Sequence, residues 1–168
     1  NGLMLSAFSE AGAILGDRTY VATAERNAEF ILDNMVRGGR VLRTYKDGQS
    51  KLNGYLEDYA FLIQGLISVH EGTFSGRWLK EAVRLAEDMV ELFWIEGESR
   101  FYDTGHDHEE MVVRARDVTD NAIPSGSSMA TDVLLRLAVI TGNGDMERRA
   151  VDSLRGTSDL MERIHSGP

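Results

Sequence analysis

The feature that most limits how this chain can fold is a weak internal repeat at an offset of 58 residues. An aromatic residue, two alanines and a glutamate recur in the same order, at Tyr20, Ala24, Ala28 and Glu29 and again at Trp78, Ala82, Ala86 and Glu87. A fainter third copy places Met146 and Ala150 at the first two positions. Each copy follows a short glycine-containing turn, and an apolar run precedes each turn. The repeating unit is therefore helix, tight turn, helix, which is typical of an array of helical hairpins.

The two helices of each unit differ in the distribution of charge. The first segments carry almost no charge, and they cover residues 1–15, 59–70 and 123–140. A helix that is apolar all round is buried on more than one side. The second segments are amphipathic, and they cover residues 18–35, 77–94 and 145–161. The alternation predicts an all-α fold of three αα-hairpins in which outer helices cover inner ones.

The predicted hairpins span about residues 1–36, 55–94 and 121–164 of a single domain, 1–168. Two long connections separate them, and both carry signals for short β-hairpins. In the first connection we expect a strand at Val41–Tyr45 before an Asp47-Gly48 turn, and in the second we expect strands at 100–103 and 111–114. Because hairpins alternate in direction, both connections should emerge at the same end. Loops longer than about 12–15 residues are usually functional or disordered, and the strand-forming residues here favour ordered connections, so a site is expected at this end.

The charge and cysteine content exclude several classes of function. The 18 basic and 27 acidic residues give a net charge of −9 without a basic block, which disfavours nucleic acid as a partner. No stretch approaches the ~20 apolar residues of a membrane span. The absence of cysteine excludes disulfides and thiol nucleophiles within the chain and is compatible with a cytoplasmic location. The first residue is Asn1 rather than methionine, so we expect a segment of a longer protein.

Four short motifs resemble a known family. They are Asn1-Gly2-Leu3-Met4, Leu56-Glu57-Asp58-Tyr59-Ala60-Phe61, Asp120-Asn121-Ala122 and Pro124-Ser125-Gly126-Ser127-Ser128. In this order and spacing they resemble the helical part of the spermatogenesis-associated protein 20 family, large proteins with an N-terminal thioredoxin-like domain. The resemblance implies an α/α toroid similar to six-hairpin glycosidases and N-acylglucosamine 2-epimerases, of which this chain would supply about half. It departs from the family at Ala115, where proline is usual, and at Ser127, where asparagine is usual.

The candidate catalytic residues are three carboxylates, Glu57, Asp58 and Asp120, each close to the start of an inner helix. Glycoside hydrolysis needs two carboxyl groups roughly 5–9.5 Å apart, and carboxylates at the same end of two inner helices could meet that distance. The alternative is that Glu57 and Asp58 only favour the helix dipole and cap free amides. Adjacent helix residues diverge by about 100°, so at most one of these two faces a cavity squarely.

The candidate substrate-binding residues come from the first connection and from the family motifs. Arg43, Tyr55 and Tyr59 offer the guanidinium and aromatic groups that suit sugar stacking and hydrogen bonding, although tyrosines also serve as packing residues. The motifs add Asn1, Asn121 and Ser125. The run Gly105-His106-Asp107-His108-Glu109-Glu110 lacks helical metal-ligand spacing and is interpreted as a solvated acidic turn. We therefore expect neither a metal nor a cofactor.

Two functions follow from these residues. In the first, the chain binds or processes a small sugar, as a glycoside hydrolase-like or sugar epimerase-like enzyme if it is active. In the second, it is a non-catalytic scaffold or binding module that partners the thioredoxin-like domain of the parent protein. Three hairpins leave apolar edges that the remaining hairpins of a ring would cover. The isolated segment is therefore expected to self-associate.

Overall fold

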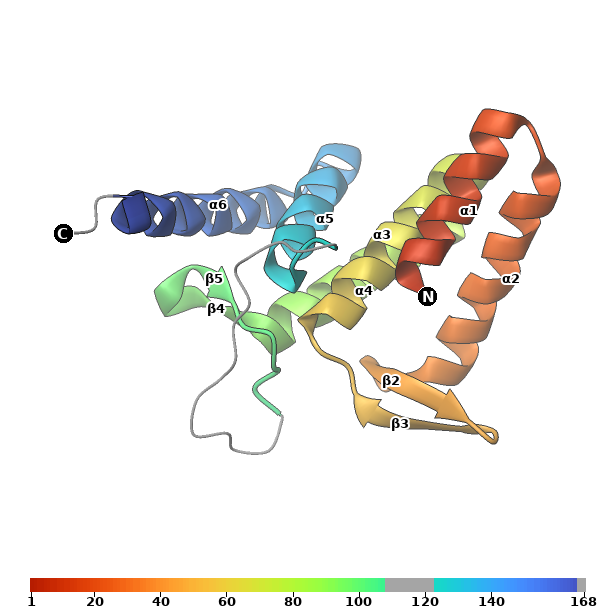
Figure 1. Cartoon of the computed structure of the whole chain (residues 1–168), viewed down its shortest axis with the longest axis horizontal. Coiled ribbons are helices and arrows are strands. Elements are labelled where there is room, and N and C mark those ends of the chain that lie inside the picture. The colour runs from red at the N-terminus through yellow and green to blue at the C-terminus, as the bar shows by residue number, and fades with distance from the viewer. Residues whose placement is uncertain (108–122, 166–168) are drawn as a thin grey trace.

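The computed structural model describes residues 1–107 and 123–165, with side chains up to residue 158. Six helices in this part of the chain follow one another as three helix–turn–helix pairs (Figure 1). They are α1 (Gly2–Leu15), α2 (Arg18–Met35), α3 (Leu56–Thr73), α4 (Gly76–Phe93), α5 (Gly126–Thr141) and α6 (Gly144–His165). The prediction of a mainly helical chain is confirmed. None of these helices is long and apolar enough to cross a membrane, within the described ranges.

A short turn connects the two helices of each pair. α1 ends at Gly16 and α5 ends at Gly142, both in the left-handed conformation that glycine adopts without strain, with φ of 68° and 73°. Asp17 then begins α2, since its carboxylate accepts a hydrogen bond from the backbone N–H of Thr19 at 2.9 Å. These local signals reverse the chain within two residues, which places the two helices of a pair against each other.

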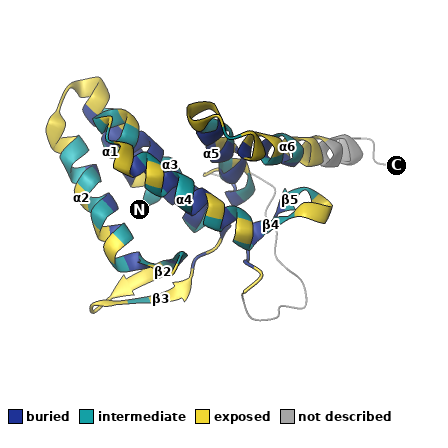
Figure 2. Cartoon of the chain, turned by 180° about the vertical axis from the view of Figure 1, so that it is seen from behind, coloured by how far each residue is buried: buried dark blue, intermediate teal, exposed yellow. Residues whose placement is uncertain are grey.

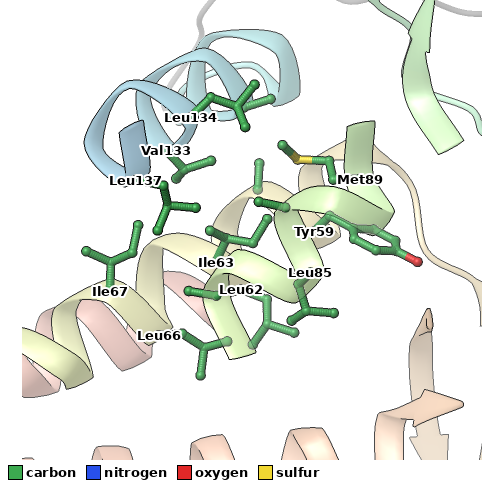
Figure 3. Packing of buried hydrophobic residues seen from close by; sticks show 14 of the residues in the cluster. Tyr59, Leu62, Ile63, Leu66, Ile67, Leu85, Met89, Val133, Leu134 and Leu137 are labelled. Atoms are coloured by element: carbon green, nitrogen blue, oxygen red, sulfur yellow. The ribbon is translucent and has the colours of Figure 1, made fainter. Parts of the chain in front are cut away.

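α3 is the central helix, and the other inner helices, α1 and α5, pack on either side of it. The outer helices α2, α4 and α6 each pack on their own hairpin partner. Figure 3 shows the core where α3, α4 and α5 meet, with Ile63 and Ile67 of α3 facing Val133 and Leu137 of α5. On its other side α3 approaches α1 closely, because a Cβ atom on Gly65 would lie 2.7 Å from the Cβ of Leu5.

The first long connection forms a small antiparallel sheet. Its strands are β1 (Val36–Arg37), β2 (Arg40–Lys46) and β3 (Gln49–Asn53), and Thr44 of β2 pairs with Lys51 of β3. Asp47 and Gly48 form the turn between β2 and β3, with φ of 52° and 75°. Successive positive φ values suit the twist of a two-residue hairpin. The predicted strand and turn are both confirmed.

The second long connection begins with a shorter hairpin, β4 (Trp94–Ile95) and β5 (Arg100–Phe101), around the 3-10 turn η1 (Glu96–Glu98). The predicted strand at 100–103 is therefore present but ends at Phe101. The predicted strand at 111–114 lies outside the described residues.

Both connections lie at the same end of the helices, as predicted. The backbone N–H of Leu56, where α3 begins, donates to the carbonyl of Asp103 in the second connection at 2.9 Å. Arg40 of the first connection forms an ion pair with Asp107 of the second, with 2.8 Å between Nη2 and Oδ1. The side chain of Arg40 is only 12% exposed and that of Asp107 is 37% exposed, so the pair is a half-buried link between the two connections.

The expectation that every charge-free helix is buried on several sides holds only for α3. On α1, Met4, Ile14 and Leu15 are 54%, 82% and 67% exposed, and Val139 of α5 is 86% exposed. Figure 2 shows this difference between the central helix and the edges. The reason is geometric, because α3 has an inner helix on both flanks whereas α1 and α5 each have one.

Candidate functional site

A cavity of ≈ 270 Å³ lies at the end of the molecule that carries the long connections. It is formed by the first turns of α1 and α3, the last turn of α2 and strand β2. Four of the residues singled out from the sequence line it, namely Asn1, Arg43, Glu57 and Asp58. The structure therefore brings residues far apart in the sequence to one surface.

The floor of the cavity is apolar and was not foreseen from the sequence. Its apolar lining consists of Leu3, Ile31, Met35, Val41, Leu42, Phe61, Leu62 and Ile123. Phe61 lies one helical turn after Glu57, and this i, i+4 spacing is the signal that could have identified it. A polar rim over an apolar floor is the usual composition of a small-molecule site.

Arg43 and the two carboxylates form the polar rim. Nη2 of Arg43 donates to Oε1 of Glu57 at 2.7 Å, and Nη1 lies 3.7 Å from Oδ2 of Asp58. The guanidinium also stacks on Tyr55, with 4.7 Å between its Cζ atom and the ring centroid. The side chains of Arg43 and Glu57 are 36% and 40% exposed, so the pair is accessible to a ligand.

Glu57 and Asp58 have different local roles. Oδ2 of Asp58 accepts a hydrogen bond from the backbone N–H of Tyr55 at 2.9 Å and so holds the residue that precedes α3. The capping alternative therefore applies to Asp58. Glu57 makes no such bond to the helix start, and among the described residues its carboxylate accepts a hydrogen bond from Arg43. Glu57 is thus the better placed of the two for chemistry in the cavity.

Tyr59, a predicted binding residue, does not line the cavity. Its side chain is completely buried against Phe93, and its hydroxyl accepts from the backbone N–H of Val41 at 2.9 Å and donates to the carbonyl of Gly39 at 3.1 Å. Burial raises the pKa of the Tyr59 hydroxyl. Tyr59 therefore acts as a core residue that fixes the turn before β2, the strand that carries Arg43.

Ser125 belongs to the start of α5. Its hydroxyl accepts from the backbone N–H of Ser128 at 3.2 Å, and it lines a separate cavity of ≈ 220 Å³ together with Thr131 and Asp132 of α5 and residues of α6. The next residue, Gly126, packs on the backbone of α3, since a Cβ there would lie 3.1 Å from the nitrogen of Glu57. The starts of α3 and α5 therefore adjoin, although Ser125 faces a different cavity from Glu57.

Asp120 and Asn121 lie outside the described residues, as do residues 108–110 of the acidic turn. Within the described ranges, no group of three or more His, Cys, Asp or Glu side chains could hold a metal ion. The Arg40–Asp107 ion pair, which joins the two connections, was not foreseen either. No local sequence signal identifies it, since its partners are 67 residues apart.

Comparison with known proteins agrees with the motifs. The chain is 35% identical to rat spermatogenesis-associated protein 20 and 33% identical to the human protein, over 98% of its own length. It is 28% identical to an uncharacterized protein of Caenorhabditis elegans over 97% of its length. No family model matches the chain. It spans 22% of the length of the mammalian relatives. The chain belongs to the spermatogenesis-associated protein 20 family, and it corresponds to about a fifth of the length of those relatives.

Proposed function

We propose that this chain forms part of an α/α toroid whose loop-bearing end binds a small polyhydroxylated ligand, such as a monosaccharide. The observation that carries the proposal is the cavity in which Asn1, Arg43, Glu57 and Asp58 meet over an apolar floor. Sugars present both hydroxyl groups and apolar C–H faces, so a site with this mixed lining is complementary to them.

The size of the cavity supports a small ligand. Pockets for drug-sized molecules measure roughly 300–1,000 Å³, and ≈ 270 Å³ lies just below that range. The arrangement of inner and outer helices supports a toroid, since α1, α3 and α5 lie side by side and each is covered by the helix that follows it. Equivalent hairpins added at the open flanks of α1 and α5 would continue the same packing.

In this proposal Glu57 is the acid or base that acts on the ligand, and Asp120 would be the second carboxylate. Arg43 and Asn1 donate hydrogen bonds to ligand hydroxyls, and Tyr55 orients the guanidinium of Arg43. Asp58 has mainly a structural role at the start of α3. Asn121 extends the binding surface. If the ligand is transformed, hydrolysis of a glycosidic bond or epimerisation of a sugar is the expected class of reaction.

A second candidate function is a non-catalytic binding module that partners a thioredoxin-like domain. The observation that favours it is the engagement of both carboxylates, because Glu57 pairs with Arg43 and Asp58 holds the start of α3. The exposed apolar side chains of α1, including Met4 and Leu15, would then serve as a contact surface.

Titration of the chain with D-glucose, D-mannose and N-acetyl-D-glucosamine, followed by protein NMR, tests the first proposal. We expect shifts at Arg43, Glu57 and Phe61. Leu3→Trp should abolish them by filling part of the cavity, because Leu3 lines it. Ile14→Trp is the matched control, since Ile14 is on the same helix, is 82% exposed and lies outside the cavity. Equal effects of the two variants, or shifts elsewhere only, would contradict the assignment.

Release of nitrophenolate from p-nitrophenyl glycosides tests whether the ligand is transformed. Glu57→Ala should abolish turnover if Glu57 is the acid or base. If turnover and sugar binding survive this change and only stability falls, the enzyme proposal fails. Sugar titrations without shifts, combined with binding of a thioredoxin-like domain at α1, would support the second function instead.

A further inference from the structure

The side chains that line the cavity carry more negative than positive charge. Among the described side chains that line it, Arg43 carries the one positive charge, and Glu57 and Asp58 carry two negative charges. The remaining lining side chains are uncharged. The side chains that line the cavity therefore carry a net charge of about −1, which disfavours an anionic ligand.

Three side chains of the protein already lie against the guanidinium of Arg43. Nη2 is held by Glu57 at 2.7 Å, Nη1 lies 3.7 Å from Asp58, and the ring of Tyr55 covers one face at 4.7 Å. Recognition of a carboxylate or phosphate by arginine usually requires two guanidinium nitrogens in a bidentate arrangement. Both terminal nitrogens of Arg43 already face carboxylates of the protein.

We infer that Glu57 determines the charge preference of the cavity, so that the site accepts neutral sugars and rejects carboxylated or phosphorylated ones. This inference rests on the proposed function for the class of ligand, but the electrostatic role of Glu57 does not depend on it. Glu57 neutralises the arginine that an anion would need, and its own charge repels the anion. Asp58 supports this effect from a longer distance and remains tied to the start of α3.

The substitution Glu57→Gln tests the inference, because it removes the charge and keeps the shape of the side chain. The first probe is inorganic phosphate, which needs no sugar binding. In the unaltered chain, phosphate at millimolar concentration should shift the Nε–Hε signal of Arg43 only weakly. In the Glu57→Gln variant, phosphate should shift this signal with an affinity at least about threefold higher than in the unaltered chain. This is the change expected when one partly exposed ion pair is lost.

Glu71→Gln is the matched control. Glu71 lies on the same helix, and it pairs with Arg136 at 2.8 Å rather than with Arg43. In this variant phosphate should affect Arg43 no more than in the unaltered chain. Equal phosphate affinity at Arg43 in the unaltered chain and in the Glu57→Gln variant would overturn the inference, as would an equal gain in affinity in the Glu71→Gln variant.

The second probe is a pair of sugars that differ in charge, D-glucose and D-glucuronate. In the unaltered chain we expect glucose to bind more tightly than glucuronate. Glu57→Gln should reduce or reverse this preference for glucose. A preference for glucuronate in the unaltered chain would overturn the inference while leaving the sugar site intact. Absence of binding by either sugar, with the phosphate result as expected, would overturn the proposed function and leave the role of Glu57 intact.

Discussion

α3 and α1 have similar composition and different surroundings. Both have long uncharged stretches, residues 59–70 of α3 and all of α1 except Glu10, yet Ile63, Leu66 and Ile67 of α3 are fully buried whereas Ile14 and Leu15 of α1 are mostly exposed. Apolar residues on a helix indicate that burial against another helix would be favourable. They do not show whether the described part of the chain supplies that helix. The comparison teaches that the central helix contributes stability and that the edge helix presents a surface.

The test of this comparison with the largest expected effect is a matched pair of leucine substitutions. Leu66→Ala should lower the free energy of unfolding by about 2–5 kcal/mol, because Leu66 is completely buried in the core cluster. Leu15→Ala should change it by less than about 0.5 kcal/mol, because Leu15 is 67% exposed. Urea unfolding followed by circular dichroism measures both. Similar losses for the two variants would mean that α1 is covered in solution.

The second test concerns the contact between the two helices. A Cβ on Gly65 would lie 2.7 Å from Leu5 Cβ and 2.8 Å from the carbonyl oxygen of Gly2, so Gly65→Ala must push α1 away from α3. We expect a loss of about 1–3 kcal/mol in the same unfolding experiment. At Gly76, in the first turn of α4, an added Cβ would have nothing within 4 Å, and Gly76→Ala should be neutral or slightly stabilising. A neutral Gly65→Ala would show that the helices are not in close contact.

The third test asks whether the open edge of α1 is a surface for association. The isolated chain should self-associate in the micromolar range, because Met4, Ile14 and Leu15 are exposed on one helix. Sedimentation velocity across that range measures it. Ile14→Lys combined with Leu15→Lys should weaken association by about tenfold, equivalent to about 1.4 kcal/mol. A monomer at every concentration in the unaltered chain would contradict the prediction.

The sequence allowed the helical hairpins to be predicted because their signals are local. Gly16-Asp17, the apolar runs and the Asp47-Gly48 turn each act within a few residues. It also allowed the end of the molecule with the site to be predicted, since alternating hairpins fix where the connections emerge. Arg43, Glu57 and Asp58 were identified as residue types suited to a site, and the cavity brings them together.

What could not be predicted depends on contacts between distant residues. The roles of Glu57 and Asp58 differ because one faces Arg43 and the other the backbone of Tyr55, and neighbouring carboxylates in a sequence do not reveal this. Tyr59 was assigned to binding by its residue type, whereas its direction on α3 takes its hydroxyl to Gly39 and Val41. The exposure of α1 likewise depends on which helices flank it.

The smallest expected effect is the pH dependence that the buried tyrosine of the central helix gives to the free energy of unfolding. Burial raises the pKa of Tyr59, so the folded state keeps this proton where the unfolded chain, with a tyrosine pKa of about 10, releases it. The stability that comes from the neutral hydroxyl is therefore complete below pH ~10 and is lost as the pH rises through the higher folded pKa.

Unfolding free energies at pH 8, 10 and 11 check this pH dependence. Tyr59→Phe should lower stability at pH 8, because it removes the acceptor for the buried N–H of Val41, but it should make the decline above pH 10 shallower. A decline that Tyr59→Phe does not alter would mean that Tyr59 ionises as readily in the folded chain as in the unfolded one. In that case the centre of the molecule would be as open to solvent as its edge, and the contrast between α3 and α1 would not hold.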